Sequence, residues 1–325
     1  MDIRLSEGKR RMTMSTIRRI CLFIMIGALI LNLNTRGLAC ESETAGSFSA
    51  KALPKGALSA GVSFEYRKYD ELGHQNAAEL HMQGEHVHNF DHDEIYNLSL
   101  AYGAGDDFEV KLDLPYVKKT FLSVHEETAG NGDYSRGLGD MGLSGKYCFY
   151  HGGMDMAALA GVKFPSGSTS QRGFNDEKLA VEELPGSGSF DYSLGLAVGK
   201  EIDRWLLGGG FLYTFKTQGA RDYEFGDVLK LGFSSSYALK PIGQFPNYRL
   251  SGEIRSSFIR KDKDKGSGVA SSGGDVLLFA PGIQLDINKQ ASAFISAPIP
   301  VNQSRGGEHS ELDYSVIAGI TMLWS

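Results

Sequence analysis

The chain has 325 residues, enough for one large domain or two ordinary ones. Its formal net charge of −6 is mild, and no basic patch is visible along it, which excludes nucleic acid as an expected partner. Glycine is abundant, with 41 residues against 9 prolines, and this composition suits tight turns and the crowded interior of a β-structure.

The N-terminus has the order of a secretory signal peptide. Arg18 and Arg19 precede an apolar run from Ile20 to Leu31, and small residues follow up to Ala39. The run is too short to span a bilayer comfortably, since a transmembrane helix takes about 20 residues. We therefore expect residues 1–39 to be a signal peptide with a long basic region, and the chain to be exported.

The cysteines leave two possibilities open at the predicted cleavage site. Leu38-Ala39-Cys40 is similar to the lipidation site of bacterial lipoproteins, but Gly37 stands where leucine is usual. Cleavage after Ala39 by the ordinary peptidase and lipidation of Cys40 therefore both remain possible. In the mature chain Cys148 would have only Cys40 as a disulfide partner, and no Cys-x-x-Cys pair predicts a zinc site.

Beyond the signal peptide, apolar residues recur with the two-residue period of a β-strand. In the last segment, Tyr314, Val316 and Ala318 share one face, while Ser315 and Gly319 lie on the other. The same pattern predicts about twelve strands, near residues 58–69, 91–104, 106–117, 138–151, 153–164, 189–201, 204–216, 225–239, 247–260, 273–287, 289–300 and 311–324.

The predicted connections alternate between short turns and long polar loops. The long loops fall near residues 70–90, 118–137, 165–188, 217–224, 261–272 and 301–310. An even number of strands with this alternation is typical of a transmembrane antiparallel up-and-down β-barrel, with short periplasmic turns and long extracellular loops. We expect an outer-membrane barrel over 57–325, preceded by a periplasmic N-terminal segment over 40–56.

A soluble β-sandwich is the alternative, because its strands also alternate. Its outward face would be highly charged, whereas here the less apolar face mixes glycine, serine and alanine with charge. Aromatic residues also lie near predicted strand ends, as the girdles of a membrane barrel require. These girdle candidates are Tyr66, Tyr69, Tyr96, Tyr102, Tyr116, Trp205, Phe215 and Trp324.

Four sequence blocks resemble a known family of outer-membrane proteins, the MetA-pathway of phenol degradation family. The blocks are Asp113-Leu-Pro-Tyr-Val117, Gly137-Leu-Gly-Asp-Met-Gly-Leu-Ser-Gly-Lys-Tyr147, Gly161-Val-Lys-Phe-Pro-Ser-Gly-Ser168 and Ala297-Pro-Ile-Pro-Val-Asn-Gln303. The resemblance covers about residues 56–324. It implies a barrel that transports small, often aromatic or hydrophobic compounds, with no catalytic residues.

The inward faces of the predicted strands carry both acids and bases. The candidates for lining the lumen are Glu65, Arg67, Glu109, Lys111, Asp113, Lys146, Lys163, Lys230, Arg249, Glu253 and Arg255. Such charges either pair across the barrel and fill it or line a water-filled path. Pairing is expected, because an unpaired charge in a narrow lumen is costly, and a conducting path remains compatible with it.

Histidines concentrate in one predicted external loop. His81, His86 and His88 lie there, and His92 follows at the start of the next predicted strand, all among carboxylates. Imidazole with carboxylate is a ligand set for zinc, copper or nickel. A polar loop that happens to be rich in histidine explains the same pattern without metal.

Catalysis is not expected from the sequence. It contains no Gly-x-Ser-x-Gly and no His-Glu-x-x-His, although His125 and His309 each lie near a serine. We expect a passive pore or transporter for small molecules that needs no cofactor. Its expected partners are outer-membrane lipid and lipopolysaccharide, the barrel assembly machinery and a small solute. A non-conducting structural or surface-binding barrel is the alternative.

Overall fold

The computed structural model describes most of the predicted mature chain. The described residues are 48–70, 89–122, 132–173, 176, 178–306 and 310–325. The predicted signal peptide and Cys40 lie outside them, so the expectations for export and lipidation remain predictions.

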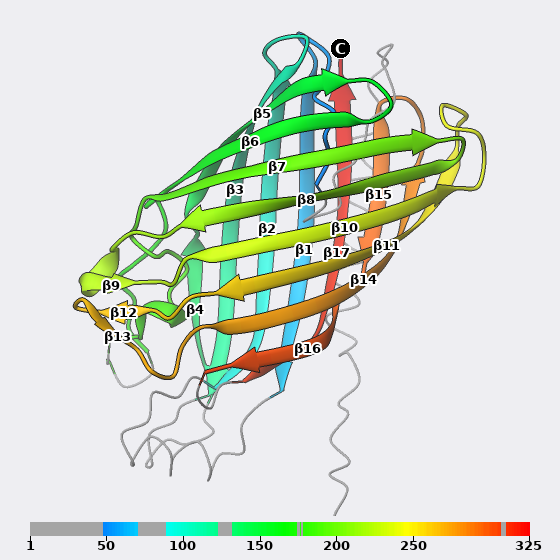
Figure 1. The fold of residues 1–325 in the computed structure, drawn as a ribbon. Coiled ribbons are helices and arrows are strands. Elements are labelled where there is room, and N and C mark those ends of the chain that lie inside the picture. The colour runs from blue at the N-terminus through cyan, green and yellow to red at the C-terminus, as the bar shows by residue number, and fades with distance from the viewer. Residues whose placement is uncertain (1–47, 71–88, 123–131, 174–175, 177, 307–309) are drawn as a thin grey trace, which may run out of the picture. The chain divides into compact units, whose positions relative to one another are not determined.

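Antiparallel strands form most of the described structure (Figure 1). The wall strands are β1 Leu58–Asp70, β2 Phe90–Gly103, β3 Phe108–Leu122, β4 Gly132–Leu138, β5 Met141–His151, β6 Asp155–Phe164, β7 Asp191–Ile202, β8 Trp205–Phe215, β10 Val228–Ala238, β11 Asn247–Ile259, β14 Gly274–Asp286, β15 Ala291–Ser296, β16 Ile299–Arg305 and β17 Glu311–Trp324. A small separate sheet contains β9 Tyr223–Glu224, β12 Lys263–Asp264 and β13 Ser267–Gly268. Two single-turn helices, η2 Val181–Glu183 and η3 Ala220–Asp222, lie in the connections.

The wall closes on itself. The first strand β1 pairs with the last strand β17, from Leu58 against Trp324 to Asp70 against Glu311, and β11 pairs with β14. Two wall strands are each interrupted, since β4 and β5 form one and β15 and β16 form the other. The predicted twelve-stranded antiparallel barrel is therefore confirmed.

Three strand ends reach into regions that were predicted as loops. Strand β3 continues to Leu122 and β4 starts at Gly132, inside the region 118–137 that was predicted as a loop. Strand β16 likewise extends to Arg305. These strand ends carry few apolar residues on their outward faces, so the alternation that marks a lipid-facing strand fades although the backbone pairing continues.

The two faces of the wall differ as the alternation predicts. Large apolar side chains are exposed on the outside of the barrel, as in Leu194, Leu196 and Val198 of β7, while Gly195 and Ala197 between them face inward. Tyr69 departs from the predicted girdle. Its hydroxyl donates to Asp93 and its ring packs on Phe90, so it belongs to the inner face. Within the described residues no helix is long and apolar enough to cross a membrane.

Each interruption of the wall is bridged by a glutamine side chain. The amide of Gln171 accepts from the backbone N–H of Arg136 in β4 and donates to its carbonyl, at 3.1 and 2.6 Å. Gln303 of β16 does the same with Leu312 of β17, at 3.1 and 2.8 Å. A primary amide offers the same donor and acceptor as a peptide group, so each side chain satisfies a backbone edge that would otherwise be open.

Candidate functional site in the barrel lumen

The structure places the predicted lumen residues on the inner face of the wall, and most of them form ion pairs. The pairs are Arg67–Glu65 at 2.7 Å, Lys111–Asp113 at 3.5 Å, Lys146–Glu109 at 3.4 Å, Lys163–Asp191 at 2.7 Å, Arg249–Asp286 at 2.8 Å and Arg255–Glu253 at 2.7 Å. Pairing offsets the cost of removing each charge from water.

Lys230 differs from the other lumen cations. It forms no ion pair with any residue in the described part of the chain, although its side chain lies on the inner face of β10. Arg67, Lys216 and Arg255 lie near enough to act on its charge. Glu65 also acts on it, but this carboxylate pairs with Arg67. The lumen near the outer end of β10 therefore carries positive charge at Lys230 that no described carboxylate pairs with.

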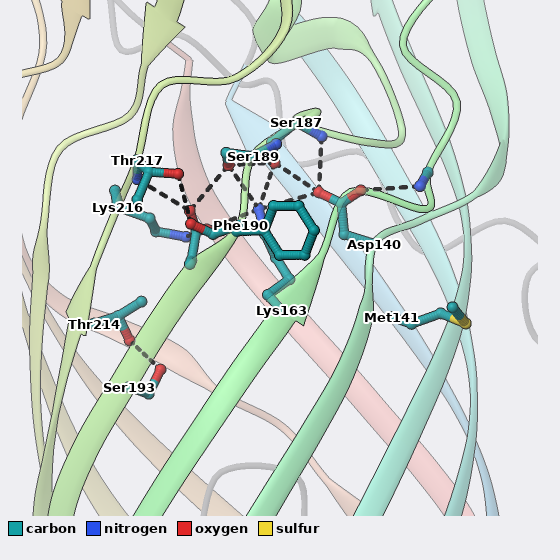
Figure 2. Close-up of polar contacts among 12 residues, drawn as sticks. Asp140, Met141, Lys163, Ser187, Ser189, Phe190, Ser193, Thr214, Lys216 and Thr217 are labelled. Atoms are coloured by element: carbon teal, nitrogen blue, oxygen red, sulfur yellow. Dashed lines mark hydrogen bonds and ion pairs between the residues drawn. The ribbon is translucent and has the colours of Figure 1, made fainter.

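A loop between β6 and β7 folds into the lumen, and Asp140 anchors it (Figure 2). We call residues 165–173 and 178–190 the inner loop. Asp140, at the break between β4 and β5, accepts hydrogen bonds from Gly167 N–H at 2.9 Å and from the N–H and hydroxyl of Ser187 at 2.9 and 2.6 Å. Lys163 bridges Asp140 and Asp191, at 3.0 and 2.7 Å.

The far side of the inner loop contacts β3 and β4. Lys119 donates to the carbonyl of Glu182 at 2.6 Å, and Ser135 donates to the carbonyl of Glu183. Leu179 and Leu184 pack against Phe121 in a buried apolar cluster. The loop thus crosses the inner face from β6 and β7 to β3 and β4, and it narrows the lumen at the end away from the short turns.

The chain before β1 also lies inside the barrel, near the short turns. We call residues 48–57 the N-terminal segment. Ala50 is 2% exposed and packs against Ala157 and Ala197, and its carbonyl accepts a hydrogen bond from the Cys148 thiol. The backbone N–H of Leu53 donates to Glu109 at 2.9 Å. The described part of the predicted periplasmic segment therefore occupies space in the lumen.

Two cavities flank the N-terminal segment. The larger, of about 350 Å³, lies among β1, β3, β15 and β17, with Lys111, Lys146 and Phe294 in its lining. The smaller, of about 120 Å³, lies toward β8, β10 and β11 and reaches Phe48 and Glu253. The segment thus divides this end of the lumen without filling it, and charged and apolar side chains line the cavities on both sides.

Asp227, at the outer end before β10, should make the stability of the barrel depend on pH. Burial would raise the pKa of Asp227, but hydrogen bonds from Lys216 N–H and the Tyr213 hydroxyl and the charge of Arg260 outweigh it and hold the pKa below its ordinary value of 3.8. A carboxyl group with a lowered pKa stabilises the fold above its ordinary pKa, and this contribution is lost as the pH falls through the lowered pKa.

We therefore expect wild type to unfold at a higher temperature than Asp227→Asn at neutral pH. The difference should shrink below about pH 4, the ordinary range of aspartate. Heat-modifiable migration on gels, measured across pH, checks this. A difference that stays constant into acid would contradict the assignment.

The family model described as "Putative MetA-pathway of phenol degradation" matches residues 99–310, which is more than half of the chain. The chain belongs to this family. The resemblance seen in the sequence blocks is therefore confirmed. No curated protein sequence matches the chain.

A solved outer-membrane channel shows the same fold, and two other barrels align less well. The COG4313 outer membrane channel from Pseudomonas putida F1 aligns with a TM-score of 0.62 at 12% identity, over 87% of this chain and all of that one (100%). The β domain of the Bordetella autotransporter BrkA reaches 0.49 at 10% identity, over 83% and 100% of the two chains. The NanC porin reaches 0.47 at 10% identity, over 81% and 98%. At these identities the likeness concerns the fold alone.

The family blocks meet at the two interruptions of the wall. Gly139, in the second block, donates its N–H to the carbonyl of Pro115 in the first block at 2.9 Å. Asp140 of the second block binds Gly167 of the third. The fourth block spans the break between β15 and β16 and includes Gln303. In this chain the blocks thus build the interrupted wall and the anchor of the inner loop.

The histidine-rich region is mostly outside the described residues, including His81, His86 and His88. His92 is described, on the outward face of β2. Its Nδ1 contacts Asp91 at 2.9 Å and its ring stacks on Tyr66 with centroids 5.4 Å apart. Within the described residues no group of three or more His, Cys, Asp or Glu side chains is arranged to hold a metal. Metal binding by this region stays a prediction.

Proposed function

We propose that this barrel passes small solutes across the outer membrane without an energy source of its own. The observation that carries the proposal is the lumen, where a closed wall surrounds polar side chains and two cavities beside the N-terminal segment. A closed barrel satisfies every backbone group internally, as lipid requires, and large apolar side chains cover its outside. This supports a location in the outer membrane, in contact with its lipid.

We favour small aromatic or hydrophobic compounds as the solutes. The family description supports this choice, and the charged lumen suits polar solutes as well. We also keep residues 1–39 as the export signal, and lipopolysaccharide and the barrel assembly machinery as partners. No catalytic activity is part of the proposal.

Reconstitution tests passage directly. Purified protein in planar bilayers is expected to conduct ions, and in liposomes it should admit phenols, alkylbenzenes or small anions faster than protein-free liposomes do. If neither conductance nor uptake appears for any of these solutes, the transport proposal fails. The barrel would then be a structural or surface-binding protein, as its paired charges and occupied lumen would also allow.

Lys230 is expected to influence which ions pass. Because it lacks an ion-pair partner among the described residues, it favours anions in the lumen near the outer end of β10. Lys230→Glu should shift the permeability ratio several-fold toward cations, and the reversal potential across a salt gradient measures this. Lys261→Glu, at an exposed position between β11 and β12, is the matched control and should change the ratio little. An unchanged ratio in Lys230→Glu would place the ion path elsewhere.

A further inference from the structure

The ring of Phe48 rests on glycines of the barrel wall. Gly210 of β8 and its pairing partner Gly232 of β10 face the ring, and Gly208, two residues before Gly210, faces the Phe48 backbone oxygen. We call these three residues the glycine floor. A Cβ added at Gly210 would lie 2.9 Å from Phe48 Cγ, and one added at Gly232 would lie 2.7 Å from Cε2. A side chain at Gly232 would displace the ring, and one at Gly210 would meet both the ring and the Leu196 carbonyl oxygen, at 2.4 Å. Without side chains at these positions the floor is open to a flat aromatic group.

An unpartnered carboxylate oxygen borders the same position. Glu253 of β11 is only 5% exposed, and its Oε2 accepts from Arg255 at 2.7 Å. Its Oε1 has no hydrogen-bond partner in the part of the chain that the structure describes, and it lies 3.9 Å from where a Gly232 Cβ would be. A buried acceptor without a donor is costly. The edge of the floor therefore favours a ring that carries a hydroxyl or another hydrogen-bond donor, which the phenylalanine ring lacks.

Space for such a molecule adjoins the floor. The cavity of about 120 Å³ is lined by Phe48, Gly208, Ser234 and Glu253. An engineered cavity of about 150 Å³ in another protein is large enough to bind benzene. Withdrawal of the Phe48 ring would enlarge the existing cavity by the volume of one aromatic ring.

We propose that the glycine floor and Glu253 form a binding site for a single aromatic ring with a hydrogen-bond donor, and that Phe48 occupies this site when the N-terminal segment is in the lumen. An aromatic solute and Phe48 then compete, so the solute that binds also releases the segment. The role of this site in transport rests on the proposed function. Binding at the site does not, and it is tested without a conductance measurement.

Cys148 reports on the position of the segment. Its thiol donates to the Ala50 carbonyl and is buried beneath the segment, 2% exposed. In a Cys40→Ser background Cys148 is the only cysteine of the predicted mature chain. The rate at which a small methanethiosulfonate reagent modifies Cys148 therefore measures how often the segment leaves.

The experiment compares three additives of similar size on the folded full-length barrel in detergent. Phenol has both the ring and the donor, toluene has only the ring, and cyclohexanol has only the donor. We expect phenol to raise the labelling rate of Cys148 several-fold, and toluene and cyclohexanol to raise it less. In Phe48→Ala labelling should already be fast, and phenol should add little. Glu253→Gln should reduce the advantage of phenol over toluene.

Two results would overturn the inference. One is equal labelling with all three additives, which would indicate a non-specific effect on the barrel. The other is fast labelling in Phe48→Ala together with no effect of phenol on wild type, which would show a mobile segment that does not compete with solute. Heat-modifiable migration confirms that each variant is folded. Failure of conductance with phenol-dependent labelling intact would reject the transport proposal and leave the binding site standing.

Discussion

Asp140→Ala is expected to destabilise the barrel more than any other single lumen substitution that we consider. The carboxylate is 6% exposed, pairs with Lys163, and receives three hydrogen bonds from the inner loop. Loss of one partner of a buried ion pair costs roughly 3–5 kcal/mol. We expect the free energy of unfolding to fall by about 3 kcal/mol, near the lower value, because Lys163 keeps Asp191 as a partner.

Urea unfolding of the reconstituted barrel, followed by tryptophan fluorescence, measures this loss. Asp140→Asn keeps one side-chain oxygen that can accept a hydrogen bond from Gly167 or Ser187. Its free energy of unfolding should therefore fall by less than that of Asp140→Ala. Asp106→Ala, at an exposed aspartate in the turn between β2 and β3, is the matched control and should unfold as wild type does. The inner loop should also become sensitive to protease in Asp140→Ala only. Wild-type stability together with a protected loop would show that Asp140 is not the anchor.

The fold was predictable because its signal is local. Alternation in single segments such as Tyr314 to Trp324 identifies each wall strand and its lipid face without knowledge of its neighbours. The closure of β1 on β17 then follows from the even number of strands. The strand ends were misjudged at Lys118 and at Asn302, where polar residues replace the apolar half of the alternation.

The contents of the lumen were not predictable in the same way. The contact between Ala50 and Cys148 joins residues 98 positions apart, and neither side chain carries a local signal. Asp140 was visible within a family block, but its role depends on where the inner loop folds. One signal was available, since the run Gly208-Gly209-Gly210 in a predicted strand indicates a close approach by another group. That group is Phe48.

Gly103→Val is expected to displace the N-terminal segment while leaving its sequence intact. A Cβ at Gly103 would lie 2.0 Å from the Pro54 carbonyl oxygen and 2.7 Å from its carbon, so the segment and β2 cannot both keep their positions. The segment should move, because β2 is paired with β1 from His92 to Tyr102 and with β3 as far as Gly103, whereas near Gly103 the segment is held by a few hydrogen bonds.

The expected result of Gly103→Val is faster labelling of Cys148 and several-fold higher conductance, because the two cavities beside the segment would merge into a wider path. Gly105→Val in the same turn is the control. A Cβ there makes only ordinary contacts, the nearest at 3.5 Å to Phe108, so labelling and conductance should stay at wild-type values. Faster labelling without higher conductance would mean that the inner loop, at the opposite end of the lumen, limits passage by itself. Unchanged labelling in a folded Gly103→Val barrel would mean that β2 shifts instead, and that the segment is held in the lumen as firmly as the wall strands are held.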